Sequence, residues 1–327
     1  MGPGRCGRGI RVLVLTNMYP TQVDPHFGCF VKDQVDDLRR LGVDVSVVAF
    51  DARSHKQRYL MAAPRLRRAL RLERYDIVHA HYGLSGALAS LQLATPVVTT
   101  FHGSDAWVRW QRTVSWLVAR RTQPIAVAPA IATRLGVHDA PVIPCAVDLD
   151  VFAPVERAEA RRELGWPRVG PCVLFPAARS DRSKIANKRV DVFDAMIDRL
   201  RRSRPGVSAT SLDGLSRREV ALAMNAADVA VITSMCEGAP VVVKEALACR
   251  TPVVSVAVGD VSTVVAGLPG CAIVAREPEA LAKAVGRALD MGRDPLLRES
   301  MVAYGRRPIA ERVLQVYRRL LADRFER

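Results

Sequence analysis

The sequence predicts an α/β protein of two domains, each with a parallel β-sheet surrounded by helices. The chain has 327 residues, of which 49% are hydrophobic and 25% charged. Domains of about 100–200 residues are usual, so two cores fit this length. Short apolar runs alternate with stretches of helical spacing in two series, a pattern typical of parallel sheets. A charged segment that contains Pro154, residues 148–166, lies between the two series.

The first series predicts an N-terminal domain over residues 1–150. The apolar run 10–15 predicts the first strand, and Val31 and Val35 share one face of a helix expected over 28–41. Gly42 should end that helix. Further strands are expected at 43–49, 76–80, 96–101, 125–128 and 142–143.

The second series predicts a C-terminal domain over residues 155–305, after a linker near 150–155. Its expected elements are strand 171–176, helix 189–202, and strands 229–232, 253–256 and 271–274. The last stretch, 309–325, carries Val313 and Tyr317 on one face and predicts a terminal helix.

Two glutamates, Glu237 and Glu245, lie on either side of the break Gly238-Ala239-Pro240. Proline suits the first helical turn, so a helix should begin near Pro240, after the buried strand 229–232. Glu237 then lies in the loop and Glu245 about one and a half turns into the helix. The positive end of a helix behind a parallel strand is typical of a site for an anionic ligand. The carboxylates could accept hydrogen bonds from sugar or ribose hydroxyls.

An ordinary helix start is the alternative for these residues. Ser234 and Glu237 also match a capping box, but that register would put Pro240 inside the helix at a cost of about 3 kcal/mol. Glu245 alone could be a solvated helix charge. The pair, together with its proline break, favours the ligand site.

Polar residues after the apolar run 96–101 indicate a second place of interest. His102 is either a hydrogen-bonded structural residue or a residue that meets the substrate. Asp105 either orients substrate or caps the next helix. Gly28, which opens the helix 28–41, either lets backbone approach a ligand closely or is an ordinary turn residue.

We expect neither a metal nor a cofactor. His79 and His81 share one strand face without further ligands nearby, and we interpret them as structural. Asp148-Leu149-Asp150 matches a metal-binding Asp-x-Asp pair in residue types only. Gly2-x-Gly4-x-x-Gly7 precedes the first strand, whereas a dinucleotide fingerprint must follow one. Seven scattered cysteines without Cys-x-x-Cys argue against a disulfide framework and favour a reducing, cytoplasmic location.

The formal net charge of +15 favours anionic ligands and surfaces. Basic and apolar positions interleave most densely in residues 58–74. This is typical of an amphipathic helix on an anionic membrane, and equally of a solvated surface helix. The basic residues carry no nucleic-acid-binding motif. No stretch approaches the roughly 18 apolar residues that a membrane span requires.

The segment from Glu237 to Glu245 resembles the Glu-x7-Glu motif of the family 4 retaining glycosyltransferases, which have the GT-B fold. Other segments are similar to further landmarks of that family, in the same order: Thr16 to Pro20, Gly28 to Val35, Tyr75 to His81, Phe101 to Asp105, and Ile143 to Asp148. Each landmark is weak alone, but their order and spacing are specific. Ala146 departs from a glycine that is common in the last of them.

The resemblance implies two Rossmann-like domains facing a cleft, with a terminal helix, 308–327, packing back onto the first domain. Glu237 would bind the hydroxyls of the donor sugar and Glu245 the ribose diol. His102 would contact the donor sugar near its reacting carbon. Further donor-binding residues would be Gly28, Gly238, Ala239, Pro240 and Val241, with Asp105 on the acceptor side.

The phosphates of the donor need cations, because charge builds up on the departing oxygen. Five cationic residues follow the strand 171–176: Arg179, Arg182, Lys184, Lys188 and Arg189. The resemblance implies one arginine at the strand end, which Arg179 fits, and one lysine at the helix start. Lys188 stands closer to the helix start than its rival Lys184. The alternative is that all five only solvate a loop.

The resemblance also implies the reaction. A sugar would move from a nucleotide sugar, UDP- or GDP-linked, to an acceptor hydroxyl with retention of configuration and without a metal. The acceptor would belong to cell-surface polysaccharide, glycolipid or natural-product biosynthesis. A GT-B-fold phosphorylase, a nucleotide-sugar epimerase and a non-catalytic nucleotide-sugar-binding protein are the alternatives.

Overall fold

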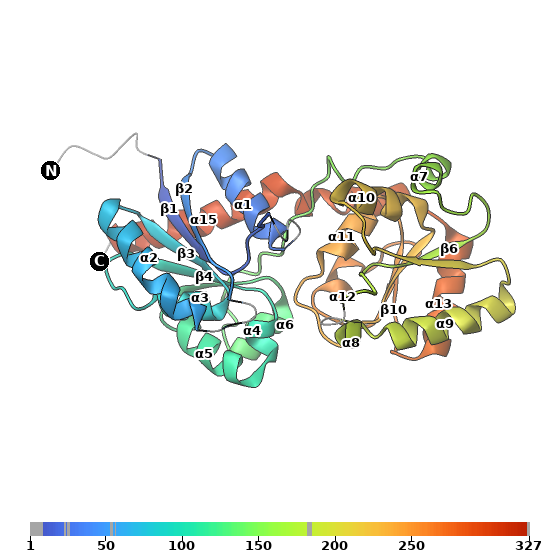
Figure 1. The fold of residues 1–327 in the computed structure, drawn as a ribbon, viewed down its shortest axis with the longest axis horizontal. Helices are drawn as coiled ribbons and strands as arrows, with labels where there is room; N and C mark the ends of the chain where they lie inside the picture. Colours follow the sequence, from blue (N-terminus) through green and yellow to red (C-terminus); the bar gives the residue numbers. More distant parts are fainter. Residues whose placement is uncertain are drawn as a thin grey trace. The chain divides into compact units, whose positions relative to one another are not determined.

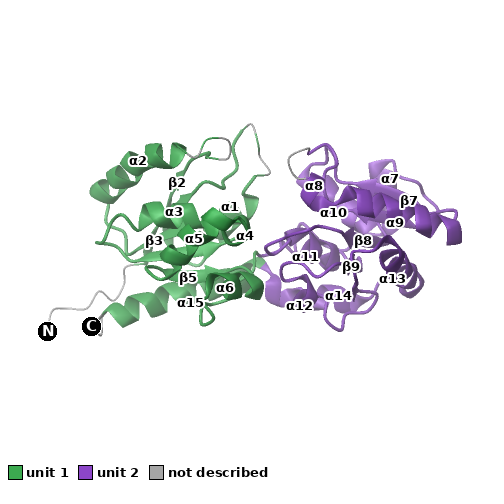
Figure 2. Ribbon diagram, turned by 90° about the horizontal axis from the view of Figure 1, so that it is seen from below, with its two compact units in different colours: residues 1–145, 306–327 green, residues 146–305 purple. Residues whose placement is uncertain are grey.

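The computed structural model describes residues 9–22, 24, 27–52, 55, 57–181 and 185–325. The chain forms two compact units, coloured separately in Figure 2: unit 1 comprises residues 1–145 and 306–327, and unit 2 comprises residues 146–305. Each unit has a five-stranded parallel sheet flanked by helices (Figure 1). The two parallel-sheet domains predicted from the alternating pattern are therefore present.

The sheet of unit 1 has the strand order β2-β1-β3-β4-β5, and all its pairings are parallel. Its strands are β1 (Arg11–Thr16), β2 (Asp44–Ala49), β3 (Ile77–His81), β4 (Val97–Phe101) and β5 (Gln123–Ala126). β3 and β4 are buried along their whole length, as central parallel strands should be. The carboxyl ends of these two strands carry His81 and lead into His102.

Helices cover the sheet of unit 1. They are α1 (Cys29–Arg40), α2 (Arg58–Leu72), α3 (Gly83–Ala89), α4 (Ser104–Trp107), α5 (Arg109–Ala119), α6 (Pro129–Leu135) and α15 (Arg306–Phe325). α3 contacts β3 and β4 as well as both α2 and α5. The helices α2, α3 and α5 therefore form one connected layer.

The terminal helix α15 belongs to unit 1, although it follows unit 2 in the sequence (Figure 2). It contacts α1, and the Arg306 guanidinium lies 2.8 Å from the buried Asp37 carboxylate of that helix. Val313 and Tyr317 are buried, as their helical spacing predicts. Residues 306–325 are thus part of the core of unit 1.

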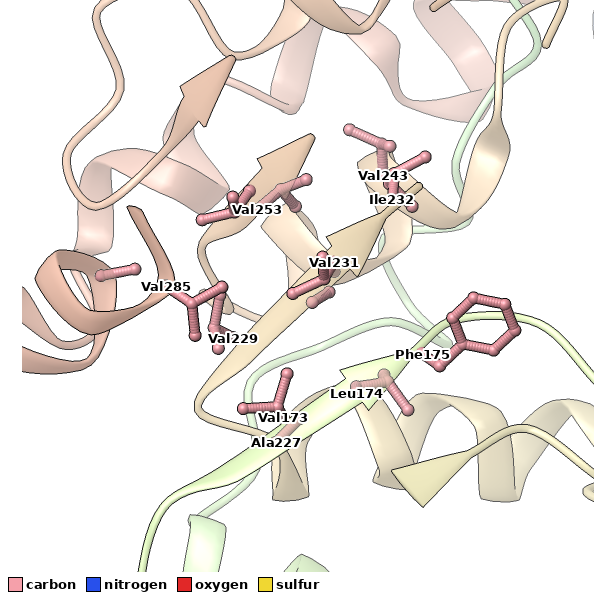
Figure 3. Close-up of a cluster of buried hydrophobic side chains, with 14 of the residues drawn as sticks. Val173, Leu174, Phe175, Ala227, Val229, Val231, Ile232, Val243, Val253 and Val285 are labelled. Carbon is pink, nitrogen blue, oxygen red and sulfur yellow. The ribbon is translucent and has the colours of Figure 1, made fainter. Parts of the chain in front are cut away.

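The sheet of unit 2 has the strand order β10-β9-β8-β6-β7. Its strands are β6 (Cys172–Phe175), β7 (Ser208–Ser211), β8 (Val229–Ile232), β9 (Val253–Ser255) and β10 (Ala272–Ile273). Its helices are α7 (Arg157–Leu164), α8 (Ile185–Lys188), α9 (Val190–Ser203), α10 (Arg217–Ala226), α11 (Val241–Ala248), α12 (Val261–Val264), α13 (Pro278–Met291) and α14 (Pro295–Glu299), with the 3₁₀ turn η1 (Val302–Tyr304). Side chains of β6, β8 and β9 form the centre of its core, together with Val243 and Val285 from α11 and α13 (Figure 3).

Three details differ from the sequence-based expectations. β7 was not expected, because its residues are polar and only half-buried at the sheet edge. Residues 142–143 form a single bridge, Ala126 with Val142, instead of a strand. The chain passes from unit 1 to unit 2 at residues 145/146 and not at 150–155, because Val147 and Phe152 already pack in the core of unit 2.

Candidate functional site

The helix that follows Glu237 begins where Pro240 predicts. The buried strand β8 ends at Ile232, and α11 begins at Val241, one residue after Pro240. Pro240 is the N-cap residue and gives no side-chain hydrogen bond to the helix start. The capping-box alternative from Ser234 is therefore wrong. Glu245 is the fifth residue of α11 and is half-buried.

Glu237 and Lys188 are brought together by this fold. Lys188 is the last residue of α8, and its Nζ lies 2.7 Å from Glu237 Oε1 in the loop before α11. Both side chains are mostly shielded from solvent, at 22% and 15% exposure. The lysine expected to bind phosphate and the glutamate expected to bind sugar hydroxyls are therefore in direct contact. Lys184, the rival lysine, lies outside the described residues.

Backbone groups fix this contact in place. Asn187 Nδ2 donates to the Cys236 carbonyl at 2.9 Å, and the Met235 N–H donates to the Asn187 carbonyl at 2.7 Å. Thr233 Oγ1 donates to the Lys188 carbonyl at 2.7 Å. Arg276 donates to the Ser234 carbonyl at 2.8 Å. The loop before α11 is thus bound to the α8 end on one side and to Arg276 on the other.

A second loop supports the break at Gly238. Gly259 has φ +56°, and a Cβ on it would lie 2.2 Å from the Gly238 carbonyl oxygen, so only glycine fits there. The next residue, Asp260, pairs with Lys244 of α11 at 2.6 Å, and both side chains are buried. The loop from Gly259 to Asp260 therefore holds both the break and the helix that follows it.

Arg179 has partners on a different element. Its guanidinium lies 2.7 Å from the Asp194 carboxylate of α9 and packs near the Phe193 ring. Its backbone N–H donates to Asp213 at 2.9 Å. Hydrogen bonds from Ser180 and Ser211 also hold the pKa of Asp213 well below its usual value, against the effect of burial. The Arg179 side chain is thus paired with α9, whereas the Lys188 side chain is paired with Glu237.

Sequence reasoning missed the residues that hold the site, namely Asn187, Thr233, Asp213, Gly259 and the pair of Lys244 with Asp260. Most of them act through backbone carbonyls and N–H groups, and such bonds leave no side-chain pattern. The charged Lys244, in a stretch that is otherwise apolar, was a signal in the sequence. A charge among apolar residues of a buried helix needs a partner.

The other group of interest lies at the carboxyl ends of β3 and β4 in unit 1. His81 Nδ1 lies 3.0 Å from His102 Nε2. His79 stacks on His81, with ring centroids 4.4 Å apart. The two nitrogens of His79 lie 2.6 Å from Tyr317 Oη and 2.8 Å from Thr100 Oγ1. His79 is therefore a structural residue, as expected.

All three rings are held neutral by their surroundings. Loss of hydration lowers the pKa of His79 to about 3 and that of His102 to about 3. It also lowers the pKa of His81 well below its usual value, and the neighbouring rings add to the effect. A charge on one ring would be poorly hydrated and would repel the others.

Asp105 is fully buried and acts on the backbone of the loop. Its carboxylate accepts the N–H of His102 at 3.0 Å and that of Gly103 at 2.7 Å. Burial raises its pKa to about 6, although these bonds lower it. Asp105 therefore shapes the turn that presents His102. Its side chain is enclosed, and its place on the acceptor side stays a prediction.

Gly28 also has a structural reason to be glycine. It has φ +73°, and a Cβ on it would lie 2.3 Å from the Met18 carbonyl carbon. The backbone at Met18 thus fills the space next to Gly28. The residue therefore fixes the loop between β1 and α1, and its contact with a donor stays a prediction.

The aspartates at positions 148 and 150 also have a structural explanation. Asp148 Oδ1 accepts the backbone N–H groups of Asp150 and Val151, each at 3.2 Å, and so caps a turn. Among the residues that the structure describes, no three His, Cys, Asp or Glu side chains are grouped so that they could hold a metal ion. Within the same residues, none of the helices has the length and apolar character needed to cross a membrane.

Comparisons with known proteins agree with this fold. A family model described as Glycosyltransferase Family 4 matches residues 6–151, and one described as Glycosyl transferases group 1 matches residues 189–291. TuaC of Bacillus subtilis, a candidate glycosyltransferase of teichuronic acid biosynthesis, is 25% identical over 85% of this chain and 89% of its own length. The D-inositol 3-phosphate glycosyltransferase of Xylanimonas cellulosilytica is 30% identical over 71% of this chain and 68% of its own length.

Solved structures show the same fold. Sucrose-phosphate synthase from Thermosynechococcus elongatus has a TM-score of 0.74 and 21% identity, covering 96% of this chain and 100% of that chain. Anabaena HepE in complex with UDP-glucose has a TM-score of 0.67 and 15% identity, covering 97% of this chain and 99% of that chain. At such identities the likeness shows the fold alone.

The two Rossmann-like units and the matched relatives define the class of protein, a glycosyltransferase with the GT-B fold. The chain belongs to glycosyltransferase family 4. The predictions of fold, family and enzyme class are confirmed.

Proposed function

We propose that this glycosyltransferase moves a sugar from a nucleoside-diphosphate sugar to an acceptor hydroxyl, with retention of configuration and without a metal cofactor. The observation that carries the proposal is the contact of Lys188 with Glu237 in front of α11. It joins a cation suited to a diphosphate and a carboxylate suited to sugar hydroxyls at the positive end of a helix. Glu245, further along the same helix, would accept the ribose hydroxyls.

The proposed step breaks the bond between the anomeric carbon and the diphosphate oxygen, and the electron pair leaves with the diphosphate. The acceptor oxygen forms its bond to the anomeric carbon on the same face. Its proton passes to the departing phosphate oxygen. Lys188 would stabilise the charge that builds up on the diphosphate. Arg179 would take part only if donor binding released it from Asp194, since the two now form an ion pair.

The names of the relatives narrow the range of candidate substrates by analogy. HepE binds UDP-glucose, which supports a uridine nucleotide as the first donor to test. The names of the relatives include a glycosyltransferase of teichuronic acid biosynthesis and a D-inositol 3-phosphate glycosyltransferase. We therefore propose a polyhydroxyl acceptor, either a growing surface glycan or glycolipid or a small hydroxylated molecule.

A donor screen tests the proposal. UDP-, GDP- and TDP-sugars are titrated against the wild-type protein by calorimetry, and slow hydrolysis of the bound donor is followed by release of nucleotide. We expect one nucleotide series to bind, and Glu245→Ala to weaken that binding by about 10-fold or more, because the proposed hydrogen bonds from the ribose hydroxyls to the carboxylate are lost. Glu299→Ala, an exposed glutamate on α14, is the matched control and should bind as the wild type does. Equal binding by Glu245→Ala and the wild type would contradict the site.

We also propose that the layer of α2, α3 and α5 contacts an anionic membrane surface. Large apolar side chains are exposed on it, including Leu60 at 77%, Met61 at 71% and Trp110 at 51%. Neither α2 nor α5 contains an acidic residue, while arginines lie beside the apolar positions on both. Tryptophan and arginine together suit the boundary between lipid headgroups and acyl chains.

Cosedimentation with vesicles tests the membrane contact. Vesicles that contain phosphatidylglycerol should retain the protein at low salt and release it at high salt, whereas phosphatidylcholine vesicles should not retain it. Replacing Arg65, Arg67 and Arg68 by Gln should abolish retention. Replacing Arg199, Arg202 and Arg287 of unit 2 by Gln removes the same charge and should leave retention unchanged. Equal loss in both variants would indicate attraction by net charge alone.

A further inference from the structure

The part-buried contact between His81 and His102 restricts where their protons can lie. The His81 Nδ1 to His102 Nε2 distance is 3.0 Å, and the two ring planes differ by 27°, so the nitrogens meet nearly edge to edge. A hydrogen bond between two neutral rings needs one N–H and one lone pair. One of the two rings must therefore donate and the other accept.

The second ring nitrogen of His81, Nε2, distinguishes the two possible directions of this hydrogen bond. His81 Nε2 is buried and has no hydrogen-bond partner among the described residues. If His102 donated, the single proton of His81 would lie on Nε2, as an N–H buried without an acceptor. Orphaned N–H groups of this kind are rare in folded proteins. If His81 donates from Nδ1, only a lone pair is left unpaired.

We infer that His81 is a positioning residue that keeps His102 in one tautomer: His81 Nδ1–H donates to His102 Nε2, and the proton of His102 lies on Nδ1. The surroundings support a fixed ring. Phe30 packs on His102 with ring centroids 5.1 Å apart, and Asp105 holds the backbone N–H of His102. His79, which bonds to Tyr317 and Thr100, stacks on one face of His81.

This assignment gives His102 a definite chemical role. The ring nitrogen that His81 does not occupy carries a hydrogen, so it can donate to an oxygen of a bound ligand. It has no free lone pair with which to take a proton from an acceptor hydroxyl. Toward a ligand, His102 is thus a hydrogen-bond donor and not a general base. This consequence for the reaction rests on the proposed function, whereas the tautomer itself does not.

The tautomer can be measured directly in the intact protein. Long-range ¹H–¹⁵N correlation on protein labelled at histidine distinguishes a protonated ring nitrogen from a bare one, and loss of signals in His102→Gln assigns that ring. We expect the wild type to show His102 as the Nδ1–H form. His81→Asn, whose side-chain amide can replace Nδ1 as a donor, should keep that form. His81→Leu and His81→Gln, which do not place a donor there, should give a mixture or the other form.

Tyr317, which contacts His79, provides a control. Tyr317→Phe removes the hydroxyl partner of His79 but touches neither His81 nor His102, so the His102 signals should remain as in the wild type. A wild-type protein with its His102 proton on Nε2 overturns the inference, and so does an unchanged tautomer in both His81→Leu and His81→Gln. The wild-type measurement decides the matter even if a variant fails to fold. Absence of sugar transfer with the expected tautomer would count against the proposed function only.

Discussion

Lys188 Nζ and Glu237 Oε1 lie 2.7 Å apart and join the end of α8 to the loop before α11. The pair spans 49 positions of the sequence, and the bonds of Asn187 to Cys236 and of Thr233 to Lys188 surround it. In this state each charge neutralises the other. A diphosphate sugar would offer a phosphate to the lysine and hydroxyls to the glutamate, and so would replace the single contact with two.

Removing the lysine tests its proposed role at the phosphate. Lys188→Ala should lower kcat by about 100-fold or more, because one preorganised charge at the leaving group is lost. The free energy of unfolding should fall by about 1–3 kcal/mol, because the mostly shielded Glu237 carboxylate loses its partner. Turnover of the identified donor and urea denaturation measure the two effects. Lys283→Ala, an exposed lysine on α13, should leave turnover unchanged. Loss of turnover in Lys184→Ala alone would show that the rival lysine binds the phosphate.

Gly28 and Gly42 separate two costs of adding a side chain. Both have positive φ, +73° and +83°, but a Cβ on Gly28 meets Met18 backbone at 2.3 Å, while a Cβ on Gly42 meets nothing within 4 Å. Gly42→Ala should destabilise unit 1 by about 1–2 kcal/mol, the cost of a left-handed alanine. Gly28→Ala should cost about 1–3 kcal/mol more, because the loop must move. Chemical denaturation of both variants provides the measurement. Equal losses would mean that the loop at Met18 yields freely.

The pair of Lys244 with Asp260 is the most enclosed ion pair of the described residues, with side-chain exposures of 0% and 6%. Lys244→Met should destabilise unit 2 by about 3–5 kcal/mol, because it leaves the aspartate charge buried without its partner. Adding Asp260→Asn should recover much of that loss. Denaturation midpoints of the single and double variants measure the coupling. Purely additive losses would mean that the pair contributes only its packing.

The histidine row makes stability depend on pH. Because the pKa of His79 is about 3 in the folded protein and about 6.5 in an unfolded chain, its contribution is full above pH 6.5 and is lost as the pH falls toward 3. His81 acts in the same direction. Asp105 opposes them, because its raised pKa of about 6 makes its contribution disappear as the pH rises from about 4 to 6. His102, whose pKa burial also lowers to about 3, acts with His79 and His81. The three rings outweigh one carboxyl group, so unfolding should become easier from pH 7 to pH 5.

Unfolding free energies at several pH values test this balance. His79→Gln should lower stability at pH 7 and flatten the pH dependence by up to about 1.4 kcal/mol per pH unit, the effect of one proton. His138→Gln, on an exposed histidine, should leave the slope unchanged. A slope that His79→Gln does not alter would show that His79 is already charged in the folded protein.

The elements with a repeating apolar pattern could be predicted from the sequence. Val31 and Val35 located α1, and the run from Val229 to Ile232 located β8, because burial imposes a period on the side chains. Pro240 located the start of α11 to within one residue, because proline restricts where a helix can begin. β7 carries no such pattern, since its side chains lie half-exposed at the edge of the sheet.

The site could be predicted only as a set of side chains. The sequence indicated Lys188 and Glu237 separately, but not that they touch, because a contact over 49 positions depends on the whole of unit 2. It placed Arg179 at the phosphate, and the fold gives it Asp194 as a partner. For Gly28 the sequence left open whether the residue lets the backbone approach a ligand or is an ordinary turn residue. The close approach of Met18 favours the turn.

The hydrogen bond between Tyr317 and His79 joins residues 238 positions apart, with the whole of unit 2 between them in the sequence. During synthesis, residues 146–305 leave the ribosome as one continuous stretch and contain every strand of their own sheet. The sheet of unit 1 is synthesised first but must wait for α15 to cover it. The half of the molecule that is translated first is therefore the half that matures last.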